Sequence, residues 1–306
     1  MEQEVPSDYS SVALPVHTVS TADLVAAARA LHRERANPIA DDPFAHRLCG
    51  RLLGLALVFP PLKWLLFDVY LRPLHPVTMC VVMRARFAEE ALEQSVADGV
   101  RQYVIIGAGM DSFAFRKPDI LERISVFEID HPVTQRKKLQ RIARAGLEVS
   151  TNHHFVPADL SQTSPLAALA SSPFDRSLPS FCSLLGVAYY LTPATLESTA
   201  RSLADGMAPG TRLVLDYLLD TASSRQRDLQ VRRRLMDFVD KRGEPMRADY
   251  SLDGMGSLMA AGGLDVVENV AMSDLAEVYR REVGPLAFEI PGIFGVGHFE
   301  VSGLRR

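Results

Sequence analysis

The spacing of hydrophobic residues changes near residue 100 of this 306-residue chain. From Ser20 to Gly99, apolar residues recur at helical spacing and prolines divide the pattern, which predicts a helical region whose last helix runs from about Val77 to Asp98. After residue 100, short apolar runs rich in β-branched residues alternate with helical stretches. Strands that helices cover on both faces have this composition, so the second part predicts a doubly wound, mostly parallel α/β sheet.

Seven short apolar segments carry the strand pattern. They are residues 102–106, 125–130, 153–157, 181–187, 212–217, 264–270 and 298–302. An Arg- and Asp-rich helical stretch at about residues 221–250 leaves this rhythm, and we expect it to pack as an insertion over the carboxyl edge of the sheet. The predicted organisation is therefore a tail (1–19), a helical cap (20–99) and a Rossmann-like domain (100–306).

Composition excludes several classes of function. Hydrophobic residues make up 47% of the chain and charged residues 23%, as in soluble globular proteins. The chain has a net charge of -4, whereas a nucleic-acid-binding protein usually carries a positive charge. The three cysteines are far apart and no His or Cys spacing fits a metal site, so neither a disulfide framework nor a metal is predicted. The acidic N-terminus, Met1-Glu2-Gln3-Glu4, differs from a secretory signal, and a cytoplasmic location is expected.

One segment, residues 52–70, is strongly apolar. Pro60-Pro61 divides it, and Lys63 and Asp68 interrupt it. A transmembrane helix needs about 20 mostly apolar residues, so we predict no membrane span. The segment is expected to form two short buried helices or an apolar cover over a ligand pocket, and contact with a membrane surface stays open as an alternative.

Candidate binding residues follow the first three predicted strands. Gly107 and Gly109, which allow a tight turn and close approach of a ligand to the backbone, follow the first strand. Asp130 closes the second strand, where a carboxylate can accept both hydroxyls of a ribose, and Asp159 follows the third, where it can read an adenine edge. In open α/β sheets ligands bind at these carboxyl ends. Arg84, on the preceding helix, can pair with a ligand carboxylate.

The glycine pattern narrows the ligand. Ser112 occupies the position at which a dinucleotide-binding GxGxxG motif has its third glycine. An incomplete cradle for pyrophosphate favours a nucleoside ligand without phosphates. A nicotinamide oxidoreductase on a similar fold stays open as an alternative but is disfavoured by this residue.

Six ordered motifs between about residues 20 and 220 resemble the leucine carboxyl methyltransferase family, in particular its bacterial branch of S-adenosylmethionine-dependent methyltransferases. The motifs are Thr21-Ala22 with Ala27-Ala28-Arg29-Ala30, Asp42-Pro43-Phe44-Ala45, Arg84-x-Arg86-Phe87, Gln102-x-Val104-Ile105-Ile106-Gly107-Ala108-Gly109-Met110-Asp111, Phe127-Glu128-Ile129-Asp130-His131-Pro132 and Pro157-Ala158-Asp159-Leu160.

The resemblance implies a class I methyltransferase fold with a seven-stranded sheet and an antiparallel last strand, and S-adenosyl-L-methionine as the cofactor. It also implies roles for residues that match the family's motifs. Arg84 and, by a looser match, Arg29 would approach the methionine carboxylate, and the segment Gly107-Ala108-Gly109 would lie against the methionine part. Asp130 would bind the ribose, and Asp159 and Leu160 would frame the adenine, while Glu128 is expected to be structural.

One position departs from the family pattern. The family has a glutamate before the Gly-Val pair that follows the fourth strand, and this chain has Leu185 before Gly186-Val187. A carboxylate contact to the cofactor's amino group is therefore absent, and backbone carbonyls around Gly107 are the expected replacement. A non-catalytic protein that binds S-adenosylmethionine is the alternative that this departure encourages.

The resemblance and the apolar cap together predict an O-methyltransferase. The expected acceptor is a carboxyl or hydroxyl group of a hydrophobic small molecule of the kind made in secondary metabolism. Tyr189 and Tyr190, after the fourth predicted strand, are the candidate catalytic residues, with Tyr217 and His298 as further polar candidates. The expected partner is this small molecule, and the oligomeric state, monomer or homodimer, stays open.

Overall fold

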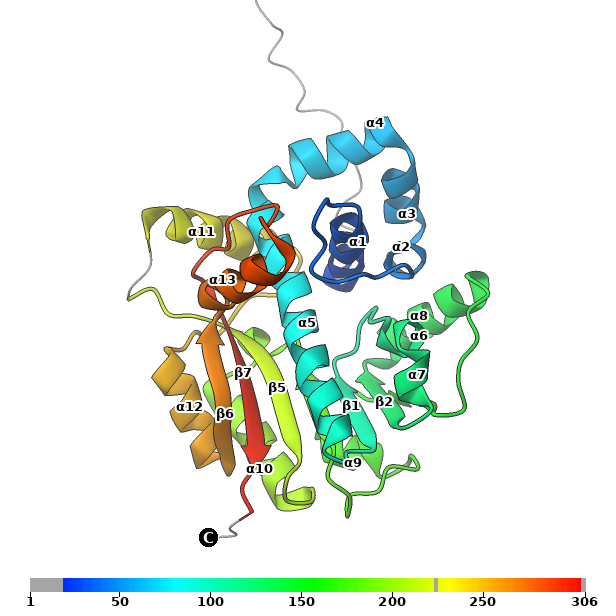
Figure 1. The fold of residues 1–306 in the computed structure, drawn as a ribbon, viewed down its shortest axis with the longest axis vertical. Coiled ribbons are helices and arrows are strands. Elements are labelled where there is room, and N and C mark those ends of the chain that lie inside the picture. Colours follow the sequence, from blue (N-terminus) through cyan, green and yellow to red (C-terminus); the bar gives the residue numbers. More distant parts are fainter. Residues whose placement is uncertain (1–18, 223–224, 304–306) are drawn as a thin grey trace, which may run out of the picture.

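Seven strands form one sheet at the centre of the part of the chain that the computed structural model describes, residues 19–222 and 225–303 (Figure 1). The strand order is β3-β2-β1-β4-β5-β7-β6, and neighbours are parallel except β7, which is antiparallel to β5 and β6. The strands are β1 (Gln102–Ile106), β2 (Ser125–Asp130), β3 (His153–Pro157), β4 (Phe181–Leu184), β5 (Arg212–Leu218), β6 (Leu264–Ala271) and β7 (Phe294–Val301). This confirms the predicted Rossmann-like class with its antiparallel strand. The predicted tail, apart from Val19, lies outside the described residues.

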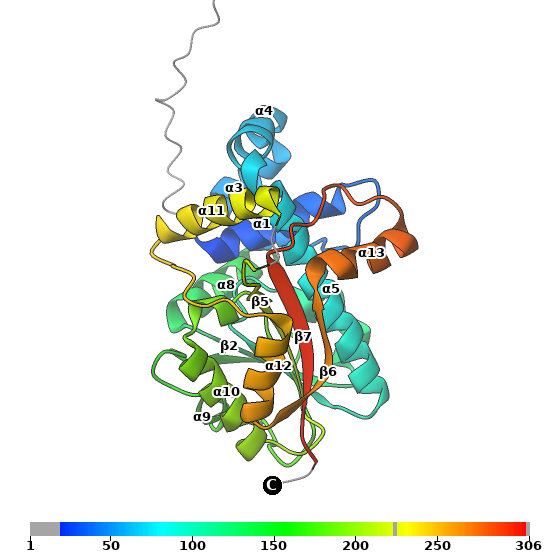
Figure 2. The same ribbon diagram turned by 90° about the vertical axis from the view of Figure 1, so that its left-hand side faces the viewer.

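Helices cover both faces of the sheet (Figure 2). One layer contains α5 (His75–Ala97), α6 (Phe113–Arg116), α7 (Pro118–Leu121) and α13 (Met272–Val283). The other contains α9 (Pro165–Leu169), α10 (Pro193–Gly206) and α12 (Leu252–Ala261). Alternate side chains of β1 point into the two layers: Tyr103 and Ile105 into the first, Val104 and Ile106 into the second. The helix α8 (Pro132–Arg144) connects β2 to β3.

The N-terminal region forms a helical cap above the carboxyl ends of the strands (Figures 1 and 2). Its elements are α1 (Thr21–Arg33), α2 (Ala45–Leu48), α3 (Arg51–Val58), α4 (Pro60–Lys63), η2 (Trp64–Tyr70) and η3 (Arg72–Leu74). The side chain of Ser20 caps α1 by accepting a hydrogen bond from the backbone N–H of Asp23. The cap has its own apolar core, which includes Ala27, Leu48, Leu53 and Phe67.

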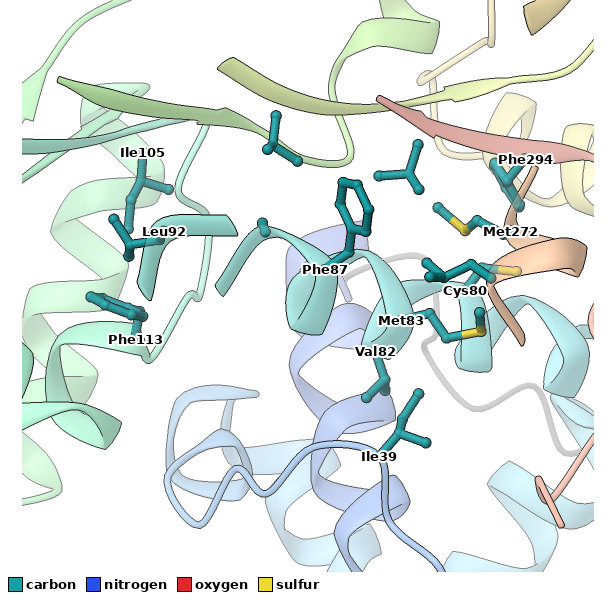
Figure 3. Close-up of a cluster of buried hydrophobic side chains, with 14 of the residues drawn as sticks. Ile39, Cys80, Val82, Met83, Phe87, Leu92, Ile105, Phe113, Met272 and Phe294 are labelled. Atoms are coloured by element: carbon teal, nitrogen blue, oxygen red, sulfur yellow. The ribbon is translucent and has the colours of Figure 1, made fainter. Parts of the chain in front are cut away.

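The helix α5 belongs to both parts. In Figure 3, Phe87 points from α5 toward the strands, whereas Val82 lies beside Ile39 of the cap. The predicted cap of residues 20–99 therefore includes a helix that also packs on the sheet. The insertion expected at about residues 221–250 contains α11 (Gln226–Asp240), which lies over the carboxyl edge of the sheet below the cap (Figure 2).

Four predicted strands have different bounds in the structure: β5 and β6 extend one residue further than predicted, to Leu218 and Ala271, and two others differ by more. β7 starts at Phe294, not at His298, because Gly295 and Gly297 hide the strand pattern. Both glycines leave room for aromatic rings: a Cβ would lie 2.5 Å from the ring of Tyr217 at Gly295 and 2.5 Å from the ring of Phe299 at Gly297. β4 ends at Leu184, not at residue 187, because Gly186 turns the chain with a φ of 77°.

Across the described ranges, the structure contains no single helix long and apolar enough to cross a membrane. The segments Arg51–Val58 and Pro60–Tyr70 reach that length and composition only when taken together, and they are bent by 111° relative to each other.

Candidate functional site

The loop after β1 lies directly against the end of β2. The backbone N–H groups of Gly107 and Ala108 both donate to the carbonyl of Ile129, at 2.9 and 3.2 Å. The N–H of Gly109 donates to one carboxylate oxygen of Asp130, and the N–H of His131 donates to the other at 2.6 Å. The glycine loop and the acid that the sequence singled out therefore form one unit.

Both the backbone conformation of Gly107 and the space around it require a glycine. Its φ is 75°, and a Cβ at this position would lie 2.7 Å from Cγ2 of Val187. Val187 belongs to the turn after β4, so the glycine loop packs between the ends of β2 and β4.

The Asp130 carboxylate is half-buried and chemically able to take further partners. Burial raises its pKa, and the hydrogen bonds from Gly109 and His131 offset part of that rise. Each oxygen accepts one backbone N–H, so each keeps a lone pair for a ligand hydroxyl.

Asp159 lies in the next loop along the same edge. The N–H of Ala158 donates to the carbonyl of Asp130 at 2.9 Å, which joins the two loops. The Asp159 carboxylate accepts hydrogen bonds from Ser161 and Gln162, and those from Ser161 chiefly hold its pKa below the usual range. Leu160 packs against the apolar core on the α9 and α10 side of the sheet. A role in framing adenine stays a prediction for both residues.

Arg84 reaches the same edge from α5. Its Nη1 donates to Asp216 at 2.7 Å and to the hydroxyl of Tyr189 at 2.9 Å. The second oxygen of Asp216 accepts the N–H of Gly186 at 2.6 Å. Within the described residues, Nε and Nη2 of Arg84 have no hydrogen-bond partner, so the guanidinium is oriented by protein and still has donors for a ligand.

Asp216 and Gly186 are the site residues to which the sequence analysis gave no role. Asp216 is an acid at the carboxyl end of an otherwise apolar strand, and it is 1% exposed. A Cβ on Gly186 would lie 2.7 Å from Nη2 of Arg84, so the guanidinium packs on the backbone there. The sequence shows an acid in an apolar strand, but it does not show that Asp216 pairs with Arg84, which lies 132 residues away on α5.

Arg29 of α1 contacts the segment that follows the glycine loop. Its guanidinium donates to the carbonyl of Met110 at 2.6 Å, pairs with Asp111 at 3.2 Å and lies 3.0 Å from Asp42. Burial would raise the pKa of Asp111, but the charges of Arg29 and Arg116 outweigh it and lower the pKa. These contacts connect the cap to the loop, and the expected contact of Arg29 with the cofactor stays a prediction.

A cavity of about 260 Å³ lies between the cap and the edge of the sheet. Its wall is mainly apolar and comes from α1, η2, α5, α11 and the segment before β7. Arg84, Asp216, Tyr189 and Tyr190 line it from the sheet side. The structure thus places both candidate catalytic tyrosines in one cavity with Arg84.

The two tyrosines differ in their partners. Tyr189 is buried and its hydroxyl accepts the hydrogen bond from Arg84, and burial raises its pKa to about 12. Tyr190 packs against Tyr189 with the ring planes at 75°, and burial also raises its pKa. Neither phenol ionises readily near neutral pH.

The further polar candidates do not line the cavity. The hydroxyl of Tyr217 donates to Asn269 at 2.8 Å. His298 is covered within the sheet, and burial lowers its pKa to about 4.

Leu185 and Glu128 have structural surroundings. Leu185 is half-buried against the core below α5. Glu128 is buried between Lys138 and His153, and these partners hold its pKa below the usual range although burial would raise it. In the described part of the chain, no group of three or more His, Cys, Asp and Glu side chains is arranged to hold a metal ion.

The chain is similar in sequence to known proteins. The model of the family described as "Leucine carboxyl methyltransferase" matches residues 22–204. The "Putative S-adenosyl-L-methionine-dependent methyltransferase YktD" of Bacillus subtilis (strain 168) is 32% identical over 208 residues, which cover 67% of this chain and 68% of that protein. A "Putative S-adenosyl-L-methionine-dependent methyltransferase" of Mycobacterium marinum (strain ATCC BAA-535 / M) is 34% identical over 221 residues, 71% and 72% of the two chains.

Solved structures agree at the level of the fold. A "putative methyltransferase" from Thermobifida fusca YX superposes with a TM-score of 0.60 at 16% identity, over 97% of this chain and 100% of that one. A DUF574 family protein from Streptomyces avermitilis MA-4680 superposes with a TM-score of 0.61 at 13% identity, over 93% and 98%.

Proposed function

The chain belongs to the leucine carboxyl methyltransferase family and is an S-adenosyl-L-methionine-dependent methyltransferase, and from this premise we propose that it methylates a carboxylate oxygen of a hydrophobic small molecule. The apolar cavity beside Arg84, Tyr189 and Tyr190 is the observation that carries this proposal. The family assignment also removes the ground for a nicotinamide oxidoreductase.

The residues along the strand ends offer suitable partners for the ribose, the adenine and the methionine part of the cofactor. Asp130 has free lone pairs for the ribose hydroxyls, and Leu160 beside Asp159 offers an apolar surface to the adenine. Arg84 has free donors for the methionine carboxylate. Leu185 offers no acceptor to the amino group, so we assign that contact to backbone carbonyls of the glycine loop. When bound, S-adenosyl-L-methionine supplies an electrophilic methyl group on a sulfonium.

The cavity wall supports an apolar acceptor. Leu24, Phe67, Leu235 and Phe294 line it from four different elements, and Arg84 lies on the sheet side. Pockets that are mostly apolar with a few convergent polar groups bind small molecules and exclude water. Its volume of about 260 Å³ suits a compact aromatic or aliphatic acid rather than a long peptide.

The titratable groups favour a carboxylate over a hydroxyl as the acceptor. A carboxylate is already ionised near neutral pH, whereas a hydroxyl benefits from a general base. The raised pKa values of Tyr189 and Tyr190 make both phenols poor bases. Both oxygens of Asp216 already accept hydrogen bonds from Arg84 and Gly186.

The histidines of the cavity do not supply a base at its inner end. Nε2 of His32 accepts the N–H of Ile39 at 2.8 Å, so its lone pair is in use. His75 starts α5, nine residues before Arg84, which separates the two by roughly 13 Å along a helix. We therefore assign the tyrosines a role as hydrogen-bond donors and packing surfaces that position the acceptor.

Transfer of a labelled methyl group tests this proposal. The protein would be incubated with labelled S-adenosyl-L-methionine and pairs of hydrophobic acids and alcohols that share one carbon skeleton. We expect methyl esters from the acids, with a rate that is independent of pH once the acid is ionised. Tyr190→Phe should lower the rate about fivefold, since one hydrogen bond is worth about 1 kcal/mol, and Tyr70→Phe, on the cap surface, should not.

Two other outcomes would contradict the proposal. Methyl ethers from the alcohols, formed at a rate that rises with pH, would indicate a hydroxyl acceptor and a general base. Binding of the cofactor without transfer to any acid or alcohol would indicate a non-catalytic binding protein.

A further inference from the structure

The outer surface of the cap exposes an unusual number of large apolar side chains. Among the described residues, 15 large hydrophobic side chains are exposed, and 8 of them lie between residues 52 and 70. We call this set the apolar cap face. It consists of Leu52, Leu55, Val58, Phe59, Trp64, Leu65, Val69 and Tyr70. Contiguous apolar patches on soluble proteins usually mark a binding surface.

The apolar cap face is not needed for packing of the cap itself. The inner sides of α3 and η2 already fill the cap core with Leu53, Leu57, Leu66 and Phe67. The two arms, Arg51–Val58 and Pro60–Tyr70, meet at Phe59 and are bent by 111° relative to each other. Figures 1 and 2 show α4 at the opposite end of the molecule from the end of β7. Val58 at this bend is 70% exposed.

The charge around this face has the opposite sign to that of the whole chain. Residues 45–75 contain four cationic residues, Arg47, Arg51, Lys63 and Arg72, and one acid, Asp68, where the whole chain has a net charge of -4. Because Lys63 pairs with Glu34 at the C-terminal end of α1, three cationic residues and one acid remain, a balance of +2. Arg47, Arg51 and Arg72 are exposed. An apolar surface with cationic neighbours matches the interface of an anionic bilayer, and Trp and Tyr are the aromatic residues enriched there.

We propose that the apolar cap face docks this protein onto the surface of an anionic lipid bilayer. Val58, Phe59 and Trp64 would enter the boundary between headgroups and acyl chains, and Arg51 and Arg72 would contact the headgroups. A second copy of the chain fits this face less well, because two-fold pairing would bring the same cationic residues together.

The docking surface and the cavity share a wall. The segment η2 presents Trp64 and Tyr70 to the outside and lines the cavity with Phe67 and Asp68. A docked protein would therefore hold the cavity next to the bilayer, which on the function proposed above would supply apolar acids. Docking itself requires no methyl transfer, so a failed transfer assay would leave it standing, and the reverse also holds.

Intrinsic fluorescence reports this contact directly, because Trp64 is the only tryptophan of the chain. The full chain would be titrated with vesicles of phosphatidylcholine, with and without phosphatidylglycerol. We expect a blue shift of the emission and quenching by lipids brominated in the acyl chain, both stronger with the anionic lipid and weaker at high salt. Unchanged emission, together with no co-sedimentation with anionic vesicles, would overturn the proposal.

Paired variants locate the contact. Val58→Ser with Phe59→Ser changes only exposed side chains and keeps Trp64 as the reporter, and it should reduce vesicle affinity at least about tenfold. Leu178→Ser with Val267→Ser, which are 44% and 52% exposed elsewhere on the surface, is the matched control and should bind as the unaltered protein does. Equal losses in both pairs, or none, would contradict the assignment.

Two other occupants give distinct results. A second copy would show as a concentration-dependent dimer in light scattering without lipid, abolished by Val58→Ser with Phe59→Ser. The N-terminal segment of residues 1–18 would show as blue Trp64 emission without lipid that shifts to the red when that segment is removed. Either result without vesicle binding would overturn docking on a bilayer.

Discussion

At the scale of single residues, two glycines at the strand ends let the backbone pack directly against side chains of other elements. Gly107 adopts a φ of 75° with Val187 at its α-carbon, and Gly186 provides the surface on which Arg84 packs. Both positions exclude a Cβ because of a side chain from another element: Val187 of the turn after β4 at Gly107, and Arg84 of α5 at Gly186. The site is therefore sensitive to the addition of single methyl groups.

Gly107→Ala tests this directly. The new Cβ would lie 2.7 Å from Val187 and the backbone would be strained, so we expect a loss of roughly 2 kcal/mol in unfolding free energy. Val187→Ala removes the clashing methyl group, and the double variant should be more stable than the sum of the two changes predicts. Urea unfolding of the four proteins measures the coupling, and strictly additive losses would show that the contact is unimportant.

Asp130→Asn tests the ribose contact. The change removes the charge and keeps the shape of the side chain, and a charged hydrogen bond is worth about 1.5–3 kcal/mol. We expect the affinity for S-adenosyl-L-methionine to fall roughly ten- to a hundredfold in titration calorimetry. Asp119→Asn, an exposed acid of α7, is the control and should bind normally. Unchanged affinity in folded Asp130→Asn would remove this residue from the site.

At the scale of elements, a buried charge cluster joins β2, β3 and α8. Glu128 of β2 pairs with Lys138 of α8, and its second oxygen lies 2.9 Å from His153 of β3. The Glu128 and Lys138 side chains are each 1% exposed. Removing one partner from such a cluster leaves an uncompensated charge in the interior.

Lys138→Met should therefore cost about 3–5 kcal/mol of unfolding free energy. Addition of Glu128→Gln removes the orphaned charge and should restore part of the loss. Because the pKa of Glu128 is lowered in the folded state, its stabilisation is full above the unfolded value of 4.5 and is lost as pH falls through the lower folded value. Urea unfolding at several pH values checks both points, and Arg201→Met, in the exposed pair with Glu197, should change little.

At the scale of the whole molecule, buried neutral histidines make the fold sensitive to acid. His32 of the cap and His298 of the sheet both have a pKa of about 4, lowered chiefly by burial from 6.5. Between these values the unfolded chain binds more protons than the folded one, so stability falls as pH falls from 6.5 toward 4.

His32→Gln isolates the contribution of the cap. The side-chain oxygen of glutamine can accept the N–H of Ile39 as Nε2 does, but it does not titrate. When the pH falls from about 7 to about 5, the unfolding free energy of the variant should decrease by about 2 kcal/mol less than that of the unaltered protein. Urea midpoints at the two pH values measure the difference, and His46→Gln, on the surface, should behave as the unaltered protein. An identical acid loss in His32→Gln would contradict the assignment.

The strands, their mostly parallel arrangement and the order of the binding motifs could be predicted from the sequence. β1 and β2 have the predicted bounds because an apolar run that ends on a glycine or an acid is a local signal, and β3 ends at Pro157 as predicted. The predicted start of β7 was wrong, because the first part of the strand contains two glycines, Gly295 and Gly297, and lacks the apolar pattern. These glycines leave room for aromatic rings that lie beside them only in the folded sheet. Local spacing carries no information about such neighbours.

Which residues contact one another across the site depends on the three-dimensional packing of the chain. The pairing of Arg84 with Asp216 and Tyr189, the anchoring of Arg29 to Met110 and Asp111, and the cavity between cap and sheet join segments far apart in the chain. Each depends on how α1 and α5 are oriented over the sheet, which is set by packing of complete cores. The apolar character of residues 52–70 can be read from the sequence, but only the fold separates their buried side from their exposed one.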